Sequence, residues 1–358
     1  MKKLLFATCC IAFLSGSLGA AAQKKSAAKN VLTQTLKGKS WSADNGNGTF
    51  TNPLFYDEFS DPDIIRVGED YYLAGTTMHS VPGLVVLHSK DLVNWEFSSY
   101  CFDRFDDSDD FNLRNGKEAY GQGIWAPAIR YHNGKFYIFS NINGHGLQVY
   151  ISDSAKGPWT HHKVNGDIYD LSVLFDEDGK IYAVHKYGNV TVTELKPDLS
   201  GPVEGSSKVV IPEGNAMGEG HHVYKINGMY YILSADYSPM GRMQCARSKS
   251  IWGPYETCVI SERESYGYAA GWSVGNMGIG RPLPEDGFKF QNNKPNGLNL
   301  GCATIHQGGI VQAPDGKWWG VSMQDFNAVG RTVCLSPVTW VDGWPYFGLE
   351  KNLGRSPR

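Results

Sequence analysis

The sequence has no stretch after residue 50 in which hydrophobic side chains follow a helical period. It also has no excess of charge of either sign, because 33 Lys and Arg residues stand against 36 Asp and Glu residues. The near balance excludes a basic surface for nucleic acid and a strongly acidic surface for cations. These absences favour an all-β protein with a neutral ligand.

The cysteine spacings of a disulfide framework or a metal motif are missing as well. Beyond residue 22 the cysteines are odd in number and have no repeated spacing: Cys101, Cys245, Cys258, Cys302 and Cys334. A chain of 358 residues buries a full hydrophobic core without covalent crosslinks. We expect buried thiols, with a bond between Cys245 and Cys258 as the alternative.

Long hydrophobic runs are absent except at the N-terminus. There a basic start is followed by an apolar run over residues 4–18 and by small residues ending at Ala22, which predicts a signal peptide at 1–22. The run is shorter than the roughly 20 residues of a membrane helix, so we expect a periplasmic or secreted protein without a membrane span after cleavage. Residues 23–49 are polar and predict a flexible leader.

Aromatic residues, at 13% of the chain, and 42 glycines are plentiful, which is typical of many short strands and tight turns. An aromatic-rich hairpin recurs five times, with its turns near residues 68, 133, 178, 227 and 315. A repeat of roughly 45 residues or more with several strands per copy has the length of a propeller blade. The sequence predicts a five-bladed β-propeller over 50–348, with two stacked β-sandwiches as the alternative.

Each hairpin is preceded, ten to twelve residues earlier, by a polar or aromatic residue. These residues are Asp61, Trp125, Asp170, Glu219 and His306. A shared offset from a shared turn predicts one structural position, so that the five side chains converge on the propeller axis. Three carboxylates in one pocket are the groups that hydrolyse a glycosidic bond. Taken alone, each carboxylate is also compatible with a turn or surface position.

The segments around these residues resemble glycoside hydrolase family 43, the five-bladed propeller arabinofuranosidases and xylosidases, over about residues 52–346. Four motifs occur in the order found in the family: Ser60-Asp61-Pro62-Asp63, Gly123-Ile124-Trp125-Ala126-Pro127, Asp170-Leu171-Ser172-Val173 and Glu219-Gly220-His221-His222. The resemblance implies that Asp61 is the general base, Asp170 the residue that adjusts a pKa, and Glu219 the general acid. It leaves Asp63, which strand alternation places on the same face as Asp61, as a hydrogen-bonding neighbour.

These roles agree with the chemistry of inversion. One carboxylate deprotonates water and one carboxylic acid protonates the leaving oxygen, about 6.5–9.5 Å apart. Asp61 and Glu219 belong to different predicted blades, which allows such a separation across the axis. Like-charge repulsion from Asp170 is expected to raise the pKa of Glu219 and keep it protonated near neutral pH.

The resemblance also implies ligand-binding residues. Trp125 is expected to form the pocket floor and Arg331 to reach sugar hydroxyls, while Met78 stands where many xylosidase-like relatives carry Phe. His222, the fourth predicted substrate-binding residue, is expected to support the strand of the acid. His306 is expected to face a structural calcium ion on the axis, with a hydrogen-bonded core histidine as the alternative. No organic cofactor is expected.

The resulting hypothesis is an inverting exo-glycosidase that releases terminal α-L-arabinofuranosyl units from plant polysaccharides or oligosaccharides. A β-D-xylosidase is the nearest alternative, and a non-catalytic carbohydrate-binding propeller is the alternative from another class. Two long segments, 103–121 and 262–299, are expected to form pocket walls. The alternative for the first of these segments is a calcium-binding Asp cluster at 103–110. Residues 349–358 are expected to be a C-terminal tail, with the start of the β-sandwich domain found in many resembling proteins as the alternative.

Overall fold

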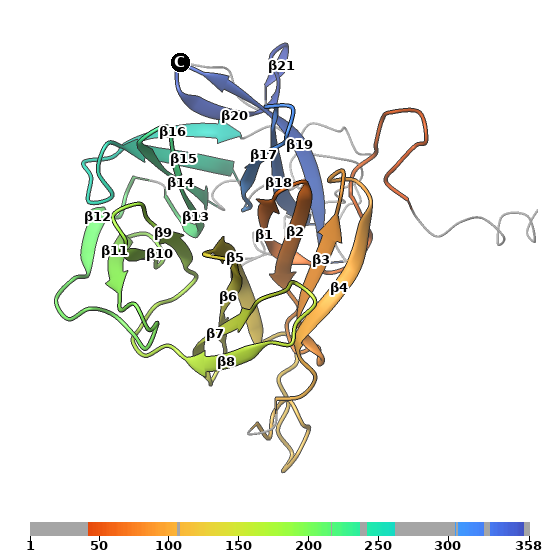
Figure 1. Cartoon of the computed structure of the whole chain (residues 1–358), viewed down its shortest axis with the longest axis vertical. Helices are drawn as coiled ribbons and strands as arrows, with labels where there is room; N and C mark the ends of the chain where they lie inside the picture. Colours follow the sequence, from red (N-terminus) through yellow and green to blue (C-terminus); the bar gives the residue numbers. More distant parts are fainter. Residues whose placement is uncertain are drawn as a thin grey trace, which may run out of the picture. The chain divides into compact units, whose positions relative to one another are not determined.

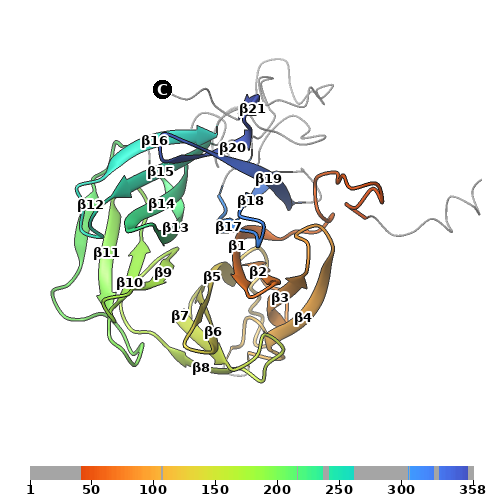
Figure 2. The same cartoon turned by 45° about the horizontal axis from the view of Figure 1, so that its top comes forward.

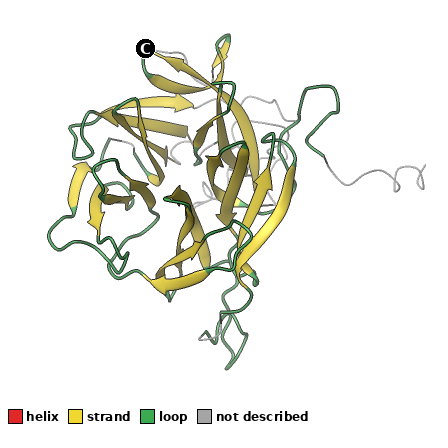
Figure 3. Ribbon diagram, viewed as in Figure 1, coloured by secondary structure: helices red, strands yellow, loops and turns green. Residues whose placement is uncertain are grey.

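The computed structural model describes residues 42–105, 108–215, 217–236, 242–261, 305, 307–325 and 330–353. The predicted signal peptide, most of the leader, His306, Cys302 and the segment 262–299 lie outside the described residues. Where the structure is described, the chain forms strands and loops (Figure 3). This part contains no helix suited to crossing a membrane.

Five antiparallel sheets make up the fold, and each is a meander of consecutive strands. The first three sheets are β1 (Ser60–Val67), β2 (Asp70–Thr76), β3 (Gly83–Ser89) and β4 (Trp95–Phe102); β5 (Ile124–His132), β6 (Lys135–Ile142), β7 (Gly146–Ser152) and β8 (Thr160–Lys163); and β9 (Ser172–Phe175), β10 (Ile181–His185), β11 (Val190–Leu195) and β12 (Lys208–Ile211). The last two are β13 (Glu219–Ile226), β14 (Met229–Asp236), β15 (Arg242–Ser248) and β16 (Glu256–Ser261); and β17 (Ile310–Gln312), β18 (Trp318–Asp325), β19 (Arg331–Val341), β20 (Trp344–Leu349) and β21 (Asn352–Leu353).

The sheets are arranged around a centre, with the first strand of each sheet innermost (Figures 1 and 2). The prediction of an all-β, five-bladed β-propeller is thereby confirmed. Each recurrent hairpin of the sequence joins the first two strands of one blade.

The hairpin turns follow from their residues. Asn133-Gly134 between β5 and β6 and Asn227-Gly228 between β13 and β14 all adopt positive φ. Two-residue hairpin turns of type I′ require this conformation at both positions, and Asn-Gly adopts it most readily. The local sequence therefore sets the register that pairs Ile226 with Met229.

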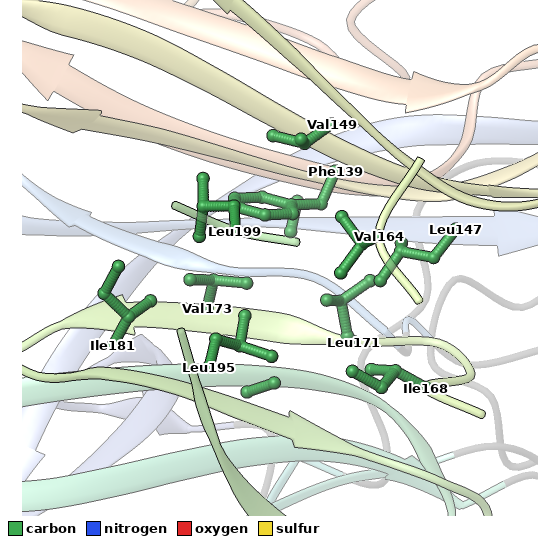
Figure 4. Close-up of a cluster of buried hydrophobic side chains, with 12 residues drawn as sticks. Phe139, Leu147, Val149, Val164, Ile168, Leu171, Val173, Ile181, Leu195 and Leu199 are labelled. Carbon is green, nitrogen blue, oxygen red and sulfur yellow. The ribbon is translucent and has the colours of Figure 1, made fainter. Parts of the chain in front are cut away.

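The core lies between neighbouring blades rather than in one central cluster. Between the second and third blades, Phe139 and Val149 pack against Val173 and Ile181 (Figure 4). Burial of a side chain of this size stabilises the folded state by about 1.5–3 kcal/mol. On the fourth blade, Cys245 and Cys258 are cross-strand partners but free thiols. The described cysteines are all buried thiols, as expected.

A segment that precedes β1 closes the ring by pairing with β19 of the fifth blade. The Asn52 side chain donates to the carbonyl of Leu335 and accepts from its N–H, both at 2.9 Å. Leu54 N–H donates to Val333 O at 2.8 Å. The compact part begins at Ala43, which is buried, so it includes residues expected in the leader.

Candidate active site

One pocket of about 410 Å³ opens among the inner ends of the blades. Six of the predicted site residues line it: Asp61, Met78, Trp125, Asp170, Glu219 and Arg331. The remaining lining residues are Gly121, Ala126, Asn141, Tyr169 and Gln307. All five blades contribute, and four of the five residues expected to converge, Asp61, Trp125, Asp170 and Glu219, meet in this pocket; the fifth, His306, lies outside the described residues.

A left-handed residue at the start of each inner strand directs these side chains. Its φ is +52° at Asp61, +33° at Ala126, +51° at Asp170, +66° at Gly220 and +44° at Gln307. In three blades the strand register shifts at this point, which marks a β-bulge. A bulge re-aims the neighbouring side chain and ends regular pairing, so the carboxylates turn into the pocket.

The bulge corrects two expectations from the sequence. Asp61 and Asp170 are themselves the left-handed residues, whereas Trp125 and Glu219 each precede one. The predicted residues therefore occupy two adjacent positions rather than one. The extra residue also breaks strand alternation, so Asp63 is fully buried and does not line the pocket with Asp61.

Asp61 is surrounded by groups that favour a carboxylate acceptor. The hydroxyl of Thr76 donates to Asp61 Oδ2 and accepts from the N–H of Ala126 at 2.8 Å. Arg331 Nη1 lies 3.7 Å from Asp61 Oδ1. The contacts link the first, second and fifth blades and hold the carboxylate at the pocket wall.

Asp170 and Glu219 lie on neighbouring blades and share one environment. Gly220 N–H donates to Asp170 Oδ2 at 2.8 Å, and Tyr169 Oη donates to Glu219 Oε2 at 3.2 Å. Burial raises the pKa of Asp170 well above its ordinary value, and the charges of Glu219 and Asp61 add to this effect.

Burial also raises the pKa of Glu219, with a further contribution from Asp61. Burial, rather than the expected repulsion from Asp170, is therefore the larger cause. The arrangement favours a protonated Glu219 at higher pH than an exposed glutamate allows.

Trp125 and Met78 give the pocket an apolar wall beside its carboxylates. Met78 forms an isolated antiparallel β-bridge with Ile124. Met78 N–H donates to Ile124 O at 3.2 Å, and Ile124 N–H donates to Met78 O at 2.8 Å. An aromatic face beside hydrogen-bonding groups is suited to a sugar ring, which has apolar faces and polar edges.

His222 does not lie in the pocket wall. Its Nδ1 is 3.0 Å from Asp63 Oδ1, and both side chains are buried. The structure therefore places His222 below the pocket, bonded to Asp63, and not among the pocket-lining residues where the sequence predicted it.

Sequence reasoning missed Tyr169, Asn141 and Gln307. Tyr169 and Gln307 directly adjoin predicted residues, so extending each motif by one position would have found them. Asn141 pairs with Trp125 across β5 and β6, and its Oδ1 accepts the N–H of Asp170 at 3.0 Å. Asn141 lies on the second strand of its blade, outside the segments in which the repeated motifs occur.

Within the described ranges, no cluster of His, Cys, Asp or Glu is suited to a metal ion. Asp109 and Asp110 of the loop 103–121 contact Arg114 and His145, whereas Asp106 and Asp107 of the alternative calcium site lie outside the described residues. Gly121 of this loop does line the pocket, as expected of a pocket wall. The axial calcium ion stays a prediction because its expected ligand, His306, lies outside the described residues.

Comparisons with known proteins agree with this geometry. Residues 50–267 match the model of glycosyl hydrolases family 43. A non-reducing end alpha-L-arabinofuranosidase of Bacteroides ovatus is 34% identical over 84% of this chain and 54% of its own length. A beta-xylosidase of Formosa agariphila is 30% identical over 92% of this chain and 56% of its own. The chain thus spans about half the length of these curated relatives.

A solved structure is also similar to this chain. A bifunctional GH43-CE protein of Bacteroides eggerthii superposes with a TM-score of 0.70 at 34% identity, covering 86% of this chain and 36% of that chain. The blades, the ordered motifs and these matches agree, and the chain belongs to glycosyl hydrolases family 43.

Proposed function

We propose that the protein is an inverting exo-glycosidase that releases single α-L-arabinofuranosyl units from the non-reducing ends of plant polysaccharides or oligosaccharides. The observation that carries the proposal is the meeting of Asp61, Asp170 and Glu219 in one pocket beside Trp125. A binding module without activity has no use for an acid with a raised pKa next to a second carboxylate.

In the proposed reaction Asp61 deprotonates a water molecule, which attacks the anomeric carbon. Glu219 gives its proton to the leaving oxygen on the other face of the sugar. Asp170 acts through Glu219, because its carboxylate binds the N–H of the next residue, Gly220. Arg331, close to Asp61, is placed to bind sugar hydroxyls as well as to orient the base.

The choice of arabinose rests on the similarity to the arabinofuranosidase of Bacteroides ovatus. The second candidate is β-D-xylosidase activity, favoured by the relatives with that name in Formosa agariphila and Bacillus subtilis. We also propose export to the periplasm or the medium through residues 1–22. N-terminal sequencing of the mature protein would test this, and a retained Met1 would contradict it.

The test uses an aryl α-L-arabinofuranoside and an aryl β-D-xyloside, with Asp61→Asn as the inactive control. We expect faster release from the arabinofuranoside, and NMR of early product should show the β-anomer before mutarotation. First appearance of the α-anomer would contradict inversion. Turnover of the xyloside alone would select the second candidate, and turnover of neither would reject both.

A further inference from the structure

Beneath the pocket, buried and half-buried polar side chains of four inner strands lie together in a cluster, which we call the axial hub. Its members are Asp63 on β1, Arg130 on β5, Ser172 on β9, and His222 and Tyr224 on β13. Tyr224 Oη accepts the N–H of Ile310 on β17 at 2.9 Å, so the fifth blade is joined as well. The hub therefore ties all five blades together at the centre of the ring.

Each oxygen of Asp63 accepts two hydrogen bonds. Oδ2 accepts from Arg130 Nη1 and from Ile129 N–H at 2.9 Å. Oδ1 accepts from Ile64 N–H at 3.1 Å and from His222 Nδ1 at 3.0 Å. Since a carboxylate only accepts, the proton of this last contact belongs to His222. Burial alone would raise the pKa of Asp63, but Arg130 and His222 hold it below its ordinary value.

Arg130 uses the rest of its guanidinium to reach the third blade. Its Nε donates to Val173 O and its Nη2 to Ser172 Oγ. Ser172 Oγ in turn accepts the N–H of Val223 at 2.9 Å, which extends the hub to the fourth blade. The planar fork of an arginine makes such contacts in fixed directions, and its charge is permanent.

The fifth blade leaves space for this cluster. A Cβ at Gly309 would lie 2.5 Å from Tyr224 Oη and 3.4 Å from Asp63 Oδ1. A cation placed among these residues would compete with the four hydrogen bonds that the Asp63 carboxylate already accepts. It would also be repelled by the positive guanidinium of Arg130. The described residues of the hub therefore do not fit a calcium ion.

We propose that Arg130 is a positioning residue for the reaction and that its guanidinium is the resident cation of the propeller centre. This inference rests on the proposed function of the pocket above the hub. Asp63 is two residues from Asp61, and Pro62 between them has a fixed φ. Because Asp61 holds a left-handed φ that its side chain disfavours, the anchored Asp63 keeps the base from relaxing out of the pocket.

The test removes the guanidinium and supplies it again from solution. We expect Arg130→Ala to lower kcat about 100-fold with little change in KM, because a misplacement near 1 Å has an effect of this size. Guanidinium at about 20 mM, far below denaturing concentrations, should restore at least part of kcat and of Tm. Urea has the same planar shape without the charge and should restore neither.

Arg66→Ala is the matched control, since Arg66 lies on the same inner strand as Asp63 but bonds only Gly68 O within the described contacts. It should show no effect of guanidinium. If Arg130→Ala does not fold, Asp63→Asn, which keeps the shape and removes the charge partner, should lower kcat in the same way. Unchanged kcat in both folded variants, or equal rescue by urea and guanidinium, would overturn the proposal.

A chelator provides an independent measurement on the wild-type protein. We expect no change in kcat or Tm, because Arg130 already provides the central charge. A loss that added calcium reverses would show that an ion is required and would overturn the inference. If the wild type hydrolyses neither glycoside, the proposed function fails, yet the rescue of Tm by guanidinium still tests the hub.

Discussion

The backbone N–H of Gly220 donates a 2.8 Å hydrogen bond to Asp170 Oδ2, so the third blade holds the residue that follows Glu219. Asp170 thereby contacts the main chain of the fourth blade beside Glu219, the proposed acid. We therefore expect a change in the backbone at Gly220 to move Glu219 relative to Asp170.

Gly220→Ala tests this link. The residue has φ +66°, and a Cβ would lie 2.4 Å from the side chain of Gln307. We expect destabilisation of about 1–2 kcal/mol from the left-handed backbone and a loss of kcat from the displaced acid. Gly228→Ala is the control, because its φ is +75° and nothing lies within 4 Å. Equal kcat in the two variants, measured with urea unfolding of each, would contradict the link.

Replacing Glu219, the proposed acid, and replacing Asp61, the proposed base, should affect activity differently. Glu219→Gln is expected to retain more activity on aryl glycosides with acidic leaving groups, which need little protonation, than on natural linkages. Asp61→Asn should lose activity on both, because it removes the group that activates water. Steady-state kinetics on the two substrate types provide the measurement. The same loss on both types for Glu219→Gln would show that another group is the acid.

Tyr169→Phe should change the pH profile in a predictable direction. The hydrogen bond from Tyr169 lowers the pKa of Glu219, in opposition to burial. The acid works in its protonated form, so activity falls as pH rises through the pKa of Glu219. Removing the hydroxyl should therefore move the alkaline limb of kcat/KM to higher pH, by about one unit or less. A shift to lower pH would contradict the role of Glu219.

Folding stability should fall in mild acid because of two buried histidines. Burial lowers the pKa of both His185 and His221 from 6.5 to about 4. Between these values the unfolded chain binds more protons, so stability is full above pH 6.5 and is lost as pH falls toward 4. The shift corresponds to about 3 kcal/mol for each residue at most.

Urea unfolding at pH 7 and pH 5 measures this effect. His185→Gln should have a smaller difference between the two pH values than the wild type. His162→Gln, on an exposed site of β8, should behave as the wild type does. A wild-type difference that stays the same in His185→Gln would assign the acid sensitivity to other groups.

Much of the fold could be predicted because the blade repeats its turn chemistry. Asn-Gly and Asp-Gly turns followed by paired aromatics recur often enough to count the blades. The bulge of the first blade could not be predicted, because Asp61 takes a left-handed backbone conformation that non-glycine residues rarely adopt.

The contacts of the axial hub could not be predicted from the sequence for a related reason. Asp63 and His222 are 159 positions apart in the chain, and only ring closure brings them together. An aspartate and a histidine taken alone suggest a surface position or a catalytic site. Their actual partners lie on other blades, and no local sequence pattern predicts how the blades are placed relative to one another. Contacts within one hairpin are readable from sequence, and contacts across the centre are not.

The bond between Asn52 and Leu335 joins residues 283 positions apart. During synthesis the segment around Asn52 therefore emerges long before its partner strand β19. Until that strand follows, the first blade presents an uncovered flank that β19 later occupies. The pocket needs Arg331 from that strand, so it is complete only once β19 has been synthesised and has joined the first blade.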